Sequence, residues 1–286
     1  MSTLEHADKE SVDMDSKDKV ARLHLVNLPS LPTLLMEALQ YTDDNQDLTN
    51  FADKISQDPP MVVRILRIAN SPFYGMSREI SSLRQAIVLL GLNRVRYMLL
   101  GVCFSNILPV RHKDFDYSLF WHHSMAVADC ARQLAVYTGI GQDIAFTAGL
   151  LHDIGLLLMV LLFPDDFSRI INEPHMNRVE TERRIMGFDH VELGSKAARH
   201  WNFPVAIQEA IEQHETPPVQ DAAISLGLLI YTANLLVTEA EQGDDSDLER
   251  QEVIAHVLDK LDISIDQAIQ WADTSRQFAD QIVAIL

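Results

Sequence analysis

Apolar residues recur with helical spacing along most of the chain, and proline, glycine and capping residues separate the runs. No segment alternates apolar and polar residues as a half-buried strand does. The pattern therefore predicts an all-α fold, arranged as a two-part helical bundle. The predicted helices cover residues 30 or 33 to 41, 48–56, 59–70, 82–90, 92–108, 118–138, 144–163, 180–186, 190–201, 204–214 and 222–240, followed by two terminal helices.

Shifts in composition divide this pattern into four segments. Residues 1–20 are acidic, rich in Asp, Lys and Ser, and without apolar periodicity, which predicts a disordered lead. Residues 21–115 form the first helical part, and residues 116–240 form the second. An acidic loop and the terminal helices occupy residues 241–286.

The most apolar stretch, residues 144–163, holds twenty residues without Lys, Arg or Glu, which is long enough to cross a bilayer. However, His152 and Asp153 lie at its centre, where ionisable groups are costly in a membrane. A buried core helix, capped by Asp143 and ended by Pro164, is the better interpretation. We expect no association with a membrane.

The net charge of −18 argues against a protein that coats nucleic acid. Residues 241–266 carry nine acids and two bases, whereas residues 60–113 carry eight bases and one acid. The basic stretch is either a solvated helical surface or a docking surface for an acidic partner or phosphates. The candidate partner-binding residues are Arg64, Arg67, Arg94 and Arg96.

Two cysteines, Cys103 and Cys130, lie in apolar surroundings and form no metal-type pair. They are interpreted as buried thiols in a reducing compartment. The first twenty residues lack the apolar core of a signal peptide. We therefore expect a cytoplasmic protein.

The candidate chemistry centres on His152 and Asp153. Neighbouring residues of a helix point about 100° apart, so the pair can share a metal only if other helices complete the shell. Imidazole and carboxylate ligands suit Mn, Fe, Zn or Ni. Spacing alone leaves open a second interpretation, in which the two side chains form a self-satisfied buried pair. Other histidines at suitable helix positions are His122, His123, His190 and His214.

The segment Gly149-Leu150-Leu151-His152-Asp153-Ile154-Gly155 resembles the signature of the HD superfamily of metal-dependent phosphohydrolases. The remaining motifs resemble the HDOD branch, which is related to the HD-GYP phosphodiesterases, and the resemblance covers residues 24–240. These motifs are Leu28-Pro29-Ser30-Leu31-Pro32, Asp58-Pro59, Leu66 to Ser71, Ala86-Ile87, Leu90-Gly91, Ala145 to Leu150, Asp189 to Gly194 and Trp201-Asn202-Phe203-Pro204. Residues 116–240 then correspond to an HD-like helical core.

Carried over position by position, the resemblance implies a site for one divalent transition metal. The implied ligands are His123, His152, Asp153, His190, His214 and Asn234. A single ion on His123, His152, Asp153 and a neighbour is the expected arrangement, and the site is also compatible with remaining empty. Asp153 becomes the catalytic residue if the protein is active.

The chain departs from the pattern of the active relatives at several positions. Gln213 stands where they place a histidine, Asn234 stands where they place an aspartate, and Leu156 stands where a lysine often follows the motif. The Gly-Tyr-Pro segment is replaced from Glu215 onward. Two-metal hydrolysis needs carboxylates to offset the cations' charge and hold an activated water, so these changes weaken the second metal most.

The resemblance and the departures together favour a bacterial signal-transduction or regulatory module that acts by binding a protein partner or a ligand, and they favour a non-catalytic role. The ligand class is a nucleotide or a phosphate. The alternative is an active metal-dependent phosphohydrolase that acts on a nucleotide or cyclic dinucleotide.

Overall fold

The computed structural model describes residues 28, 55–75, 79–92, 95–100, 112–173, 177–216, 223–242 and 248–284. Within these ranges the chain is helical and contains no strand, so the predicted all-α class is confirmed. The helices are α4 (Pro59–Ala69), the 3₁₀ turn η1 (Pro72–Tyr74), α5 (Leu83–Leu90), α7 (Tyr117–Ala135), α8 (Gln142–Leu151), α9 (Ile154–Leu162), α10 (Pro164–Ile171), α11 (Arg178–Met186), α12 (His190–His200), α13 (Val205–Gln213), α14 (Leu226–Gln242), α15 (Leu248–Lys260) and α16 (Ile265–Val283).

Several predictions fall outside the described residues. They are the lead at 1–20, the helix ending at 41, most of the helix at 48–56, and Arg94 and Cys103. The second cysteine, Cys130, is buried as expected.

Aspartate side chains cap the starts of three helices; α4 and α12 begin at the predicted residues, and α7 begins one residue before the predicted 118. Asp58 accepts a hydrogen bond from the amide of Met61, and Asp116 accepts one from Leu119. Asp189 and Glu192 form a reciprocal capping box at α12. Such caps satisfy amides that the first helical turn leaves without partners, so α12 begins at His190 with little freedom to shift.

The prediction of a single apolar helix at residues 144–163 is wrong, because two helices occupy this stretch. Helix α8 ends at Leu151, residues 152 and 153 form a turn, and α9 begins at Ile154. Gly141 rather than Asp143 is the N-cap of α8. Pro164 both follows α9 and opens α10. The stretch from Gln142 to Leu162 is long and apolar enough to cross a membrane, but its most apolar window is 83% buried inside the protein, as a core helix requires.

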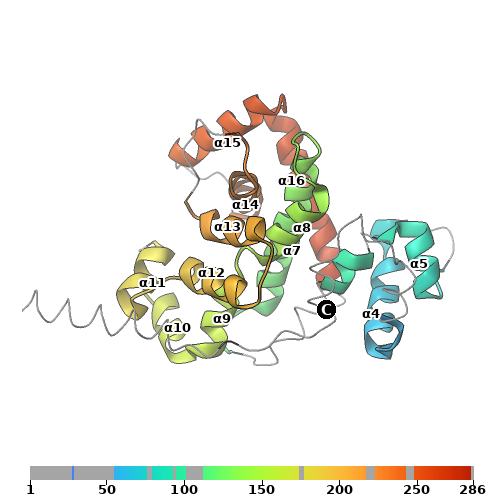
Figure 1. The fold of residues 1–286 in the computed structure, drawn as a ribbon, viewed down its shortest axis with the longest axis horizontal. Helices are drawn as coiled ribbons and strands as arrows, with labels where there is room; N and C mark the ends of the chain where they lie inside the picture. The colour runs from blue at the N-terminus through green and yellow to red at the C-terminus, as the bar shows by residue number, and fades with distance from the viewer. Residues whose placement is uncertain are drawn as a thin grey trace, which may run out of the picture.

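Helix α7 packs against α8, α14 and α16 to form the centre of the bundle, and α12 joins it through α9 and α13. Figure 1 shows α4 and α5 to one side of this bundle and α9 to α12 at its lower end. The turn at 152 and 153 therefore lies where α7, α12, α13 and α14 approach one another.

Two glycines permit this close approach. A methyl group on Gly149 would lie 2.7 Å from the α carbon of Ala128 in α7. A methyl group on Gly155 would collide with the carbonyl oxygen of His190 in α12. Backbone thus contacts backbone on both sides of the turn, which brings His152 and Asp153 within reach of donors on both neighbouring helices.

Candidate metal centre

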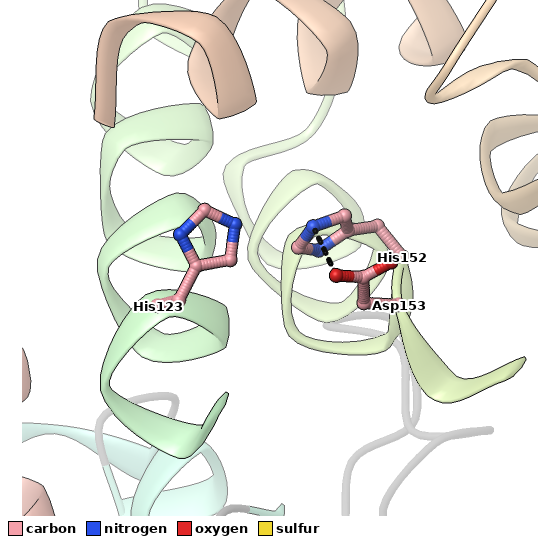
Figure 2. Close-up of side chains that lie close together, drawn as sticks. All are labelled: His123, His152 and Asp153. Carbon is pink, nitrogen blue, oxygen red and sulfur yellow. Dashed lines mark ion pairs between the residues drawn. The ribbon is translucent and has the colours of Figure 1, made fainter. Parts of the chain in front are cut away.

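The six residues carried over as ligands come from separate elements and gather around the turn between α8 and α9. His123 lies on α7, His190 is the first residue of α12, His214 caps the end of α13, and Asn234 lies on α14. Figure 2 shows the ring of His123 facing that of His152 across the centre, and the two ring centroids are 5.5 Å apart.

The tightest group of donors consists of Asp153, His190 and His214. The Oδ1 atom of Asp153 lies 3.4 Å from His190 Nε2 and 3.3 Å from His214 Nε2, and the two nitrogens are 3.3 Å apart. Donors bonded to one ion at about 2.1 Å lie about 3.0 Å apart in an octahedral shell and about 3.4 Å apart in a tetrahedral one. The spacing of this triad therefore fits a single small divalent ion.

Backbone carbonyls fix the rings of His152 and His214. The Nδ1 atom of His152 donates to the carbonyl of Gly149 over 2.7 Å, and Nδ1 of His214 donates to the carbonyl of Ile211 over the same distance. A carbonyl only accepts, so Nδ1 carries the proton in each ring and a neutral ring keeps its Nε2 lone pair for the centre. Metal-binding histidines are usually held in this way.

His190 is held by a carboxylate instead of a carbonyl. Glu182 of α11 is fully buried, and its Oε2 atom accepts from the backbone amide of His190 over 2.8 Å and from Nδ1 over 2.7 Å. Burial alone would lower the pKa of His190, but the hydrogen bond to Glu182 and the charges of Asp153 and Glu182 raise it to about 9. In the metal-free protein this ring therefore carries a proton at neutral pH.

His152 presents an unpaired nitrogen to the centre. Its Nε2 atom is buried and has no hydrogen-bond partner among the described residues, and it lies 3.7 Å from Asp153 Oδ2, the contact dashed in Figure 2. Burial lowers the pKa of this imidazole to about 3, so the ring is neutral and the contact is not a charged pair. An unsatisfied buried acceptor is costly, and a bound cation would satisfy it.

Asp153 remains ionised in the middle of these rings. Burial would raise the pKa of its carboxyl group, but His152, His214 and His190 together hold the pKa well below its usual range. Its two oxygens face different neighbours, because Oδ2 lies toward His152 and Oδ1 toward His190 and His214. The carboxylate thus belongs to both candidate donor triads, His123–His152–Asp153 and Asp153–His190–His214.

His123 is engaged at both ring nitrogens. Nδ1 lies 3.0 Å from Glu241 Oε2, and Nε2 lies 3.0 Å from the side-chain oxygen of Asn234. Burial acts to lower the pKa of His123, but the hydrogen bond and charge of Glu241 outweigh it and raise the pKa. Nε2 of His123 must therefore give up its hydrogen bond to Asn234 before it can bind a metal. The expected single ion on His123, His152 and Asp153 has a better-formed competitor in the other triad.

Sequence reasoning missed three carboxylates at this centre, namely Glu182, Glu215 and Glu241. Glu215 follows His214 directly, and its Oε1 atom lies 3.8 Å from His190 Nε2. Glu182 shares the buried face of α11 with Thr181, Ile185 and Met186, so helical spacing carried a signal for it. Glu241 lies seven residues after Asn234, two turns along the same face of α14, which is also a readable spacing.

The substituted positions have definite places in the structure. The Gln213 side chain lies against α14, where a methyl group on Gly227 would overlap it, so it fills an interface between helices. Leu156 is buried at the edge of the centre and donates its amide to the carbonyl of Asp153 over 3.0 Å.

Residues 28–217 match the model of the HDOD domain family. The chain belongs to the HDOD domain family. A 205-residue region is 26% identical to an uncharacterized protein of Treponema pallidum (strain Nichols), and the match covers 67% of this chain and 38% of that protein. The HDOD chain thus spans well under half of that relative's length.

Solved structures share the HDOD fold over nearly the whole chain. A protein of Shewanella amazonensis SB2B, provisionally assigned as a phosphohydrolase, is 25% identical with a TM-score of 0.71, and the match covers 92% of this chain and 97% of that one. An HDOD domain protein of unknown function from Geobacter sulfurreducens is 24% identical with a TM-score of 0.74, covering 96% and 97%. A provisionally assigned signal transduction protein of Marinobacter aquaeolei VT8 is 20% identical with a TM-score of 0.74, covering 94% and 64%.

A cleft of about 840 Å³ opens over the HDOD centre. His123, Asp153 and His214 lie in its wall, as do Glu215 and Asn234. A ligand of small-molecule size therefore has access to the donors from this side.

The basic residues proposed for partner docking are not all on the surface. Arg96 is 2% exposed, and its Nη2 atom bonds to Thr147 while Nη1 lies 3.8 Å from Asp143. The assignment of Arg96 to a docking surface is therefore wrong, because its charge is used to join residues 95–100 to α8. Arg64 is half-buried and Arg67 is exposed, both on α4.

Proposed function

We propose that this chain is a regulatory HDOD module that binds one divalent transition metal and acts by binding a ligand or a protein partner. The residues that bind the metal in this proposal are Asp153, His152, His190 and His214. The observation that carries it is the mutual spacing of 3.3–3.4 Å among Asp153 Oδ1, His190 Nε2 and His214 Nε2. The fixed Nδ1 protons of all three rings add support, because they direct the Nε2 atoms inward before any ion arrives.

The second half of the centre supports one ion rather than two. Both ring nitrogens of His123 already have hydrogen-bond partners, Glu241 at Nδ1 and Asn234 at Nε2, so neither nitrogen is free for a metal. Asn234 supplies a neutral amide where hydrolysis by two metals needs a carboxylate. Asp153 is then the one carboxylate shared between the triads. These features favour binding over phosphodiester cleavage.

A bound ion supplies positive charge and open coordination positions that an anionic ligand group can occupy. The chain's own residues do the positioning. Glu182 orients His190, the carbonyls of Gly149 and Ile211 orient His152 and His214, and the cleft admits the ligand. A protein partner that senses the occupied state completes the regulatory role.

The second candidate is a metal-dependent phosphohydrolase that acts on a nucleotide or cyclic dinucleotide. The opening of the cleft directly onto Asp153 favours it, as does the likeness to the Shewanella amazonensis protein. In that case Asp153 is the catalytic residue that holds the reacting metal and water.

Metal content and turnover, measured on the same purified protein, separate the two. We expect about one equivalent of metal and no hydrolysis of bis(p-nitrophenyl) phosphate. Asp153→Ala should remove the metal, and His200→Ala, an exposed position on the same helix as His190, should retain it. Turnover that Asp153→Ala abolishes would establish the second candidate. A protein that binds no added Mn²⁺, Fe²⁺, Zn²⁺ or Ni²⁺ contradicts both.

A further inference from the structure

Large apolar side chains line part of the cleft over the metal centre, and we refer to them as its apolar wall. Its residues come from α7, α9, α10 and α14 and include Leu119, Phe120, Leu156, Phe167, Ile171 and Leu235. Nothing in the metal-binding role accounts for so large an apolar surface beside the donors.

Two residues of the apolar wall are close neighbours of donors along the chain. Leu156 follows Asp153 by one turn, and Leu235 follows Asn234 directly. Both leucine side chains are buried. A ligand group that contacts these two leucines meets hydrocarbon, where a sugar hydroxyl or a second phosphate finds no hydrogen-bond partner.

The outer part of the wall is exposed to water. Leu119 is 61% exposed and Ile171 is 42% exposed, although both line the same cleft as the donors. Large apolar side chains that share a cavity and remain open to solvent are typical of ligand grooves. Covering them with an apolar ligand removes this surface from water and contributes to affinity.

The charges of the cleft limit the ligand to a single anionic group. Five acids line it (Asp114, Asp116, Asp153, Glu215 and Glu241), against two bases, Arg178 and Arg250. Asp114 and Asp116 flank Phe115 on the approach to the apolar wall. A ligand with several phosphates is repelled there, whereas one anionic group on the metal is matched by the cation.

We infer that the cleft takes an amphipathic ligand with one anionic group: a carboxylate or phosphate headgroup at the metal centre, and an aliphatic or aromatic body along the wall from Leu156 to Leu119 and Ile171. The inference rests on the proposed function, because the headgroup needs the bound ion. It names the ligand class that this regulatory site recognises.

Calorimetric titration of Mn²⁺-loaded protein tests the inference with two matched pairs of probes: octyl phosphate against ethyl phosphate, and octanoate against acetate. We expect the octyl member of at least one pair to bind at least tenfold more tightly, and the better pair identifies the headgroup. A double variant, Leu119→Gln with Ile171→Gln, should lose at least fivefold of the octyl advantage without weakening the short probe. Val136→Gln is the matched control, since Val136 is 57% exposed and lies outside the cleft lining.

The outcomes distinguish this inference from the function it rests on. Equal binding of long and short probes by protein that holds its metal overturns the ligand class and leaves the proposed function intact. Octyl binding that survives metal removal undiminished overturns the placement of the headgroup. Tighter binding of a cyclic dinucleotide than of octyl phosphate also overturns the inference. Failure to bind metal at all overturns the proposed function and this inference with it.

Discussion

The donors on the two sides of Asp153 are the same kinds of residue held in opposite ways. On the α12 and α13 side, His190 and His214 have their outer nitrogens anchored and their inner nitrogens within 3.4 Å of Asp153. On the α7 and α14 side, His123 has acceptors at both nitrogens. On the first side the inner nitrogens face Asp153, whereas on the second side the inner nitrogen of His123 is already engaged by Asn234.

The difference shows how one amide changes the role of a neighbouring histidine. Nε2 of His123 donates a hydrogen bond to the side-chain oxygen of Asn234, so this nitrogen is not available as a metal ligand. His152 differs from His123 in this respect. Its Nε2 atom has no hydrogen-bond partner among the described residues.

Removing a histidine ring from each side should give the largest difference in metal affinity between the two sides. We expect His190→Ala and His214→Ala each to weaken metal affinity at least about 100-fold, because each takes one ligand from the tight triad. His123→Ala should weaken it less than about tenfold. Competition with a chromogenic chelator measures all three, and His200→Ala serves as the control. Equal losses on both sides would contradict the proposed asymmetry.

Substituting the carboxylates that hold the histidine rings should also weaken metal affinity unequally, with smaller losses than removing a ring. Glu182→Gln removes the charge that orients His190, and we expect metal affinity to fall about 10- to 100-fold. Glu241→Gln acts on His123 and should change the affinity less than about threefold. The same chelator competition applies, with far-ultraviolet circular dichroism to establish that both variants fold. A larger effect from Glu241→Gln would indicate that the metal binds in the His123–His152–Asp153 triad instead.

The protonation of His190 gives a prediction for pH. With a pKa of about 9, the ring is protonated at pH 7 and must lose its Nε2 proton to bind a metal. Metal binding should therefore release about one proton at pH 7, and affinity should rise about tenfold per pH unit up to pH about 9. Calorimetry in buffers of different ionisation enthalpy counts the proton. A pH-independent affinity above pH 7 would show that His190 is already neutral.

Restoring the missing carboxylate should narrow the difference between the sides. Asn234→Asp places a charge beside His123 and Asp153, and we expect bound metal to rise from about one to about two equivalents. Asn202→Asp, at a position with positive φ that aspartate tolerates, is the control. Metal content of the purified variants decides the outcome. An unchanged stoichiometry would mean that Glu241 and His123 exclude the second ion without help from Asn234.

The fold was more predictable than the details of the site. Caps at Asp58 and Asp189 are local signals, and the helices at 59–70 and 190–201 begin where they indicate. The break at residues 152 and 153 was not predicted, because an uninterrupted apolar run does not show where backbone contacts from α7 and α12 will end a helix.

The set of candidate metal ligands came from the resemblance to the family. The difference between His123 and the other histidines in their availability to a metal did not. Whether His123 is free to bind a metal depends on Glu241 and Asn234, more than 100 residues away along the chain. The burial of Arg96 depends in the same way on Asp143 and Thr147. Contacts at such separation leave no periodic trace in a single sequence.

Gly149 and Gly155 have a consequence for how far related sequences can diverge. Because backbone meets backbone at both positions, no side chain sets the distance of the turn from α7 or α12. Substitutions elsewhere in the core can exchange one apolar shape for another without altering that distance. The donor positions are thereby insulated from changes of side-chain shape in the surrounding core.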